Sequence, residues 1–132
     1  MKLPISKEGV FTPNFNKNKE LPVTDQITVR YRQPTVAIKN RCRSKPQAKA
    51  ISRADGRVEQ MEITIDKDDL ATLKEMIISI SNCSYGEGDG PEQKIVSAQN
   101  LIDAPLVFEP LLKEIVKEFD RVLDESNINE KN

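Results

Sequence analysis

Alternating apolar and polar positions predict two β-strands in this chain. Residues 26–32 place three apolar side chains on one side of an extended backbone and three polar ones on the other, namely Ile27, Val29 and Tyr31 against Thr28, Arg30 and Arg32. This period of two is typical of a strand with one face in water. Residues 58–65 end in the same alternation, and the turn signal Asp55-Gly56 precedes them. We therefore expect a hairpin around Asp55 and Gly56, with residues 58–65 as its second strand.

Two longer segments carry the apolar spacing of three and four residues that predicts amphipathic helices. The first runs from about Lys67 to Ser81, with Asp66 as its expected N-cap. Its apolar stripe consists of Leu70, Leu73, Met76, Ile77 and Ile80. The second helix is expected over residues 106–124, with an apolar face formed by Phe108, Leu111, Leu112, Ile115, Phe119, Val122 and Leu123.

The segment between these two helices is predicted to hold a loop and a short helix. Residues 85–91 contain three glycines and a proline, so we expect them to be irregular. Ser97 is expected to cap a short helix over residues 98–103. This helix should end at Ala104-Pro105, because the residue before a proline avoids the helical region.

The two ends of the chain differ from its middle. The first 22 residues contain three prolines that exclude a helix there, which are Pro4, Pro13 and Pro22. We therefore predict an extended arm over residues 1–22, a single domain over residues 23–125 and a flexible polar tail over residues 126–132. Residues 35–50 leave strand and helix open, since Pro46 opposes an unbroken helix and the remaining composition permits one.

These elements together predict an α+β fold. Its small antiparallel sheet would contain residues 27–32, residues 58–65 and a middle strand, and the two amphipathic helices would cover it. A mostly helical bundle is the alternative. Hydrophobic residues make up 37% of the chain and aromatic residues 5%, whereas the apolar share of a compact globule approaches about half. We therefore expect a thin core and stability gained through assembly.

Charge divides the chain into two halves. Residues 1–60 hold thirteen Lys and Arg against five Asp and Glu, and residues 61–132 hold seven against sixteen. This asymmetry indicates a basic surface and an acidic surface, either of which could recruit an oppositely charged partner. The alternative is that the two halves attract each other, within a monomer or between subunits.

The residue types argue against catalysis. The sequence has no histidine, which excludes Ser-His-Asp and Cys-His catalysis and His-based zinc sites. The glycine-rich loop lacks the spacing of a phosphate-binding loop, and its acids Glu87 and Asp89 would repel phosphate. The same two acids supply too few oxygens for a calcium loop. We therefore expect no enzymatic activity, no cofactor and no metal.

Cysteine usage and hydropathy bear on location. Cys42 and Cys83 are expected to be free thiols in a reducing compartment. The longest apolar runs fall short of the roughly 20 residues that span a membrane. The first ten residues lack the apolar centre of a secretory signal. We therefore expect a cytoplasmic protein without a membrane partner.

One cluster of cations has functional character. It comprises Lys39, Arg41, Arg43, Lys45, Lys49, Arg53 and Arg57. In an extended segment the first four of these would lie on one face and could contact phosphates. The alternative is a solvated or acid-paired face, because Tyr31 is the one nearby aromatic residue that could stack on a base.

Two groups of short strings carry a family resemblance. One group is VFTPNFNKNKELP at residues 10–22, DQITV at 25–29 and QPT at 33–35, and the other is SAQNLIDAP at 97–105, a leucine-rich helix and KEIV at 113–116. Both resemble small tail-morphogenesis proteins of tailed bacteriophages, in particular tail assembly chaperones. Members of that family are mostly helical, bind the tape-measure protein or tail-tube subunits and have no catalytic residues. The basic residues 39–57 and the strand-like residues 58–65 depart from this pattern.

The resemblance implies a non-catalytic protein that binds the tape-measure or tail-tube protein in the host cytoplasm. The candidate partner-binding residues are Phe11, Phe15, Lys39, Arg41, Arg43, Lys45, Leu111, Ile115 and Phe119. One alternative is a structural component of the virion, at the head–tail connector or neck, that is ordered by homo-oligomerisation. Another is a nucleic-acid-binding protein that uses residues 39–57.

Overall fold

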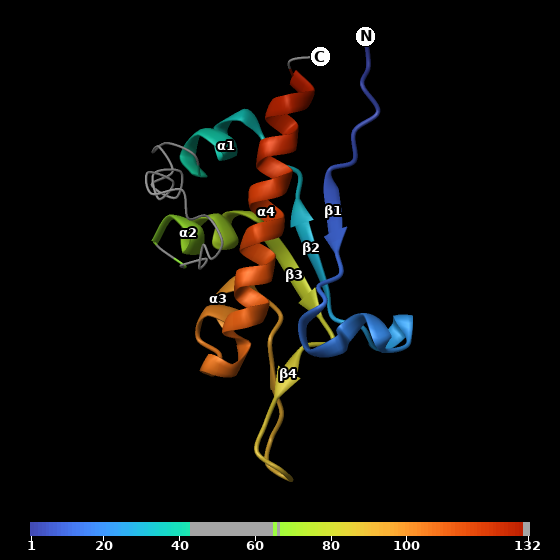
Figure 1. Cartoon of the computed structure of the whole chain (residues 1–132), viewed down its shortest axis with the longest axis vertical. Coiled ribbons are helices and arrows are strands. Elements are labelled where there is room, and N and C mark those ends of the chain that lie inside the picture. The colour runs from blue at the N-terminus through green and yellow to red at the C-terminus, as the bar shows by residue number, and fades with distance from the viewer. Residues whose placement is uncertain (43–64, 66, 131–132) are drawn as a thin grey trace, which may run out of the picture.

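A three-stranded antiparallel sheet and one long helix organise the molecule (Figure 1). The computed structural model describes residues 1–42, 65 and 67–130, with the backbone alone for residues 125–130. Within these residues the sheet has the order β1-β2-β3, and helix α4 (Glu109–Glu130) packs against one of its faces. The predicted α+β class is confirmed.

Strand β2 (Thr28–Arg32) is the centre of the sheet. The side chains of Val29 and Tyr31 are buried, whereas Arg30 and Arg32 are exposed, so the predicted strand and its inward face are confirmed. Tyr31 lies against Phe119 of α4, with 5.4 Å between the ring centroids. This aromatic contact joins the sheet to the helix.

Strand β1 (Glu8–Phe11) lies within the segment predicted as an extended arm. It pairs antiparallel with β2, in a register that places Gly9 opposite Tyr31 and Phe11 opposite Val29. Phe11 packs against the core, and Glu8 forms an ion pair with Arg30 at 2.6 Å. The prolines do not prevent a strand over residues 8–11, because Pro4 and Pro13 lie outside the paired residues. The expectation of no helix within residues 1–22 is wrong for residues 15–20, which form the 3₁₀ helix η1 (Phe15–Glu20).

The third strand is a correction to the sequence analysis. The helix predicted over residues 67–81 ends at Met76 as α2 (Lys67–Met76), and the chain continues directly into β3 (Ile77–Ser81), which pairs with β2. Three isoleucines within four residues favour a strand over a helix, because β-branched side chains are restricted on a helix. Residues 58–64 of the strand predicted over 58–65 lie outside the described residues, as do the Asp55-Gly56 hairpin and the Asp66 cap. Ile65 is described and is not part of a strand.

The remaining elements follow the expected order. The sequence left strand and helix open for residues 35–50, and within that segment residues 36–42 form helix α1 (Val36–Cys42). Strands β4 (Ser84–Tyr85) and β5 (Gln93–Lys94) pair as a two-stranded hairpin. The Ser97 hydroxyl accepts a hydrogen bond from the Asn100 amide at 3.2 Å and caps α3 (Ala98–Ile102), as predicted. After Pro105, the 3₁₀ helix η4 (Leu106–Phe108) leads into α4.

Helix α4 supplies the largest part of the core. All seven residues of the apolar face predicted for residues 106–124 are buried, with Phe108 on η4 and Leu111, Leu112, Ile115, Phe119, Val122 and Leu123 on α4. The helix continues through Glu130, whereas a flexible tail had been expected from residue 126. Residues 111–130 contain neither glycine nor proline, so the sequence has no strong breaker there. Among the described residues, no helix is both long and apolar enough to cross a membrane.

Candidate functional site

The connection between β3 and β4 organises two neighbouring clefts. Asn82 adopts a left-handed backbone conformation with φ of 60°, and its amide donates hydrogen bonds to the carbonyls of Thr24 at 2.9 Å and Gln26 at 3.0 Å. Asparagine tolerates this conformation better than most residues. Asn82 thereby fixes the 3₁₀ helix η2 (Val23–Asp25) beside the β4–β5 hairpin.

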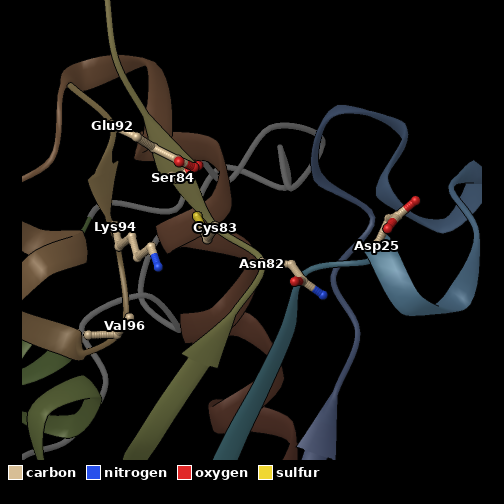
Figure 2. Close-up of a pocket in the computed structure, with 7 residues that line it drawn as sticks. All are labelled: Asp25, Asn82, Cys83, Ser84, Glu92, Lys94 and Val96. Atoms are coloured by element: carbon tan, nitrogen blue, oxygen red, sulfur yellow. The ribbon is translucent and has the colours of Figure 1, made fainter. Parts of the chain in front are cut away.

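Figure 2 shows the more polar cleft, which has a volume of about 480 Å³. It is lined by Asp25, Asn82, Cys83, Ser84, Glu92, Lys94 and Val96. Its charged groups come from two sides, with Asp25 on η2 and Glu92 and Lys94 at the hairpin. The lining includes groups that can act as nucleophiles, among them the Cys83 thiol, the Ser84 hydroxyl and the Lys94 amine.

The environment of Cys83 does not activate its thiol. The residue is 5% exposed, and burial raises the pKa of the thiol above its ordinary value of 9.0. The reactive species is the thiolate, so a raised pKa lowers its population at neutral pH. In the described part of the chain, no group of three or more Cys, Asp or Glu side chains could hold a metal ion. The Cys83 thiol in the polar cleft is therefore not an activated nucleophile.

A second cleft, of about 380 Å³, adjoins the first and shares Asp25, Asn82, Cys83 and Ser84 with it. Its apolar wall contains three aromatic rings. Phe108 lies between the other two, with ring centroids 5.9 Å from Phe15 and 5.8 Å from Tyr85. Phe108 is buried, whereas Phe15 and Tyr85 are half-exposed. Leu21 and Val107 extend this wall and are 47% and 68% exposed.

This cleft adjoins another apolar cleft, of about 550 Å³, beneath the hairpin loop. The two share Tyr85 and Val107, and Pro91 and Pro105 continue the surface of the second one. We call the two clefts together the apolar groove. The charged residues among its described lining are acidic, namely Asp25 and Glu87.

The first wall of the groove depends on a buried asparagine. Asn18 belongs to the 3₁₀ helix η1 (Phe15–Glu20) and is 2% exposed. Its amide donates to the carbonyls of Pro13 at 2.8 Å and Ile27 at 3.0 Å, and it accepts from the Ile27 amide at 2.6 Å. These bonds hold a non-helical turn at Asn16 and Lys17 and so place Phe15 over Phe108.

The candidate residues from the sequence have different positions in the fold. Phe15 lines the groove, and Phe11 is half-buried against the core. Leu111, Ile115 and Phe119 are each 0% exposed, so they are core residues of the folded chain and do not form a surface. The expectation that the apolar face of the long helix would be a binding surface needs this correction, because the sheet covers that face.

The cationic candidates do not form a single face in the described residues. Lys39 and Arg41 lie on α1, where positions two apart point to different sides of the helix, and Arg41 forms an ion pair with Glu75. The alignment of the cations required an extended segment, and residues 39–42 are helical, so that condition is not met there. Arg43 and Lys45 lie outside the described residues.

Sequence reasoning missed the main groove residues, Leu21, Tyr85 and Val107. Tyr85 stands at the start of a glycine-rich loop, and Val107 follows a proline within three apolar residues. From sequence alone, an apolar side chain near the start of a helix is ordinarily assigned to the core. Val107 instead lines a cleft together with residues of the β4–β5 hairpin. No known protein family, curated protein or solved structure matches this chain. The site therefore rests on its geometry.

Proposed function

We propose that this chain is a non-catalytic assembly protein whose apolar groove holds an apolar segment of a partner protein. The observation that carries the proposal is the groove itself, which is lined by the half-buried rings of Phe15 and Tyr85 and by the exposed side chain of Val107. Aromatic residues are enriched in the centres of protein–protein interfaces. Clefts that hold ligands measure about 300 to 1,000 Å³, which includes both parts of the groove.

The resemblance to tail assembly chaperones supports a partner class. In that reading the partner is the tape-measure protein or the tail-tube protein of a tailed bacteriophage, and the site of action is the host cytoplasm. A chaperone of this kind would cover an apolar segment until the segment is used in assembly. The groove supports this role because it offers apolar contact area, and the Cys83 thiol in its lining is not activated.

The test is binding to tape-measure and tail-tube proteins encoded near this chain, measured by co-purification and by titration. Val107→Asp places a carboxylate in the groove at a side chain that is 68% exposed, so the variant should fold normally. We expect this change to weaken binding at least about tenfold, because the complex would bury an unpaired charge. Val36→Asp is the matched control, since Val36 is 69% exposed on α1 and lies outside the groove.

Two results would contradict the proposal. One is the absence of binding to either partner, and the other is equal loss of binding by the Val107 and Val36 variants. Mass spectrometry of purified particles separates the chaperone from a structural virion component. A chaperone is absent from the finished particle, whereas a connector or neck subunit is present in it.

A further inference from the structure

The first seven residues present a second apolar feature, at the other end of the molecule. Met1, Leu3 and Ile5 alternate with Lys2, Pro4 and Ser6. The three apolar side chains are 115%, 64% and 70% exposed, respectively. We call residues 1–7 the leading segment. Its alternation would put the apolar side chains on one side of an extended backbone, and nothing in the same molecule covers them among the described residues.

The leading segment and the groove face in opposite directions. The segment continues β1 away from η1, whereas the groove lies beyond the other end of β1, between η1 and the β4–β5 hairpin (Figure 1). Hydrogen bonding fixes this direction as far as Lys7, whose carbonyl accepts from the Gln33 amide at 3.1 Å. The apolar side chains of one molecule therefore lie at the opposite end from its own groove.

Charge and shape make the two features complementary. The leading segment carries Lys2 and Lys7 and no acid. The charged residues among the described groove lining are Asp25 and Glu87, and both are acidic. An extended segment that inserts Leu3 and Ile5 beside Tyr85 and Val107 would thus bring its lysines near carboxylates. Such pairing favours one binding orientation and rejects acidic segments.

We propose that the groove binds the leading segment of a second copy of this chain. The contact is heterologous, since one copy donates the segment and the next donates the groove. In a pair of copies, the copy that donates its segment keeps a free groove, and the copy that donates its groove keeps a free segment. Copies therefore join head to tail, into a ring if the rotation between them closes and into a filament if it does not.

This inference rests on the same groove as the proposed function. It names the segment that fills the groove when no partner protein is present. A tape-measure or tube segment would compete with the leading segment for Tyr85 and Val107. Partner binding would then separate the copies, so self-association would hold the groove covered until the partner arrives.

The experiment is sedimentation velocity of two variants, alone and mixed. The first carries Leu3→Asp and Ile5→Asp, which damage the segment and leave the groove intact, and the second carries Val107→Asp, which does the reverse. The wild-type mass should rise above 14.9 kDa between about 10 and 500 μM, because contacts this small are weak. Each variant alone should remain a monomer, with at least about tenfold weaker association.

The equimolar mixture of the two variants is the decisive sample. Each variant supplies the half that the other lacks, so an equimolar mixture should form a species of twice the monomer mass and nothing larger. A mixture that stays monomeric would overturn the proposal, as would a segment variant that associates like wild type. Val36→Asp is the control and should associate normally. The two proposals fail separately, because the segment variant keeps its groove and should still bind the tape-measure or tube protein.

Discussion

Asn18 shows how one buried polar side chain can shape a segment that has little regular structure. Its amide satisfies two carbonyls and one amide of the backbone, at Pro13 and Ile27. These groups belong to the two chain segments that flank η1, so the side chain closes a loop between β1 and β2. A buried backbone group without a partner costs about 1 to 3 kcal/mol, and Asn18 supplies the partner for one buried contact at Pro13 and two part-buried contacts at Ile27.

Asn18→Ala is expected to lower the free energy of unfolding by about 2 to 4 kcal/mol, because it leaves these backbone groups without their partner. Urea denaturation measures the change. Asn14→Ala is the control, since Asn14 is exposed and its side chain makes no capping hydrogen bond. We expect the control to change stability by less than about 0.5 kcal/mol. Equal changes in the free energy of unfolding for the two substitutions would contradict the structural role of Asn18.

Cys83 links stability to alkaline pH. Burial raises the pKa of its thiol in the folded chain above the value of 9.0 that applies when it is unfolded. Above pH 9 the unfolded chain loses a proton that the folded chain retains, so the free energy of unfolding falls as pH rises. We expect this decline to be steeper in the wild type than in Cys83→Ala. Urea titrations of both proteins between about pH 8 and 10.5 measure the difference, and parallel curves would contradict it.

At the scale of elements, the sequence predicts faces better than it predicts element types. The inward side chains of β2 and the seven predicted apolar residues, one on η4 and six on α4, were identified correctly, because an uninterrupted period of two or of 3.6 is a strong signal. The run from Leu70 to Ile80 fits the helical period although its last part is β3. Leu73 and Met76 are buried from the helix, and Ile77 and Ile80 from the strand. The same hydrophobic core therefore requires apolar side chains on both α2 and β3, and a helical spacing fits the whole run although its last part is a strand.

The pairing of β1 with β2 depends on a glycine. Gly9 lies opposite Tyr31, and a Cβ atom at position 9 would stand 2.7 Å from Cε2 of the Tyr31 ring. The ring has little room to move, because it packs against Phe119. The glycine thus allows the tyrosine to cover the backbone of the edge strand.

Gly9→Ala is therefore expected to lower the free energy of unfolding by about 1 to 3 kcal/mol through overpacking. Val10→Ala provides the comparison, because Val10 is in the same strand but is 65% exposed on the other face. In a Tyr31→Leu background the Gly9→Ala substitution should cost less, since the ring is gone. A double-mutant cycle by urea denaturation tests this coupling, and an unchanged cost in the leucine background would contradict it.

At the scale of the molecule, the site was harder to predict than the fold. The α+β class follows from local periodicity, whereas the apolar groove is made where η1, η4 and the hairpin meet. Phe15 was identified as a candidate, but Tyr85 and Val107 gain their role from contacts between segments far apart in sequence. Leu111, Ile115 and Phe119 were assigned to a surface because an amphipathic pattern alone does not tell whether the sheet of the same chain or a partner covers it.

The leading segment provides a prediction for the whole molecule. Removal of residues 1–6 should change the free energy of unfolding by less than about 0.5 kcal/mol, because these residues are exposed and precede the paired part of β1. Urea denaturation of a dilute sample, in which the chain is monomeric, measures this. A loss greater than about 1 kcal/mol would mean that the segment packs on its own molecule.

The placement of Tyr85 has a spectroscopic consequence. The chain contains two tyrosines and no tryptophan. Tyr31 is enclosed between the sheet and α4, whereas Tyr85 is half-exposed in the wall of the groove. Ultraviolet emission from this protein therefore comes from one phenol in a constant environment and one whose hydration changes when the groove is filled. An unlabelled sample should report occupancy through the quenching of that second phenol by iodide.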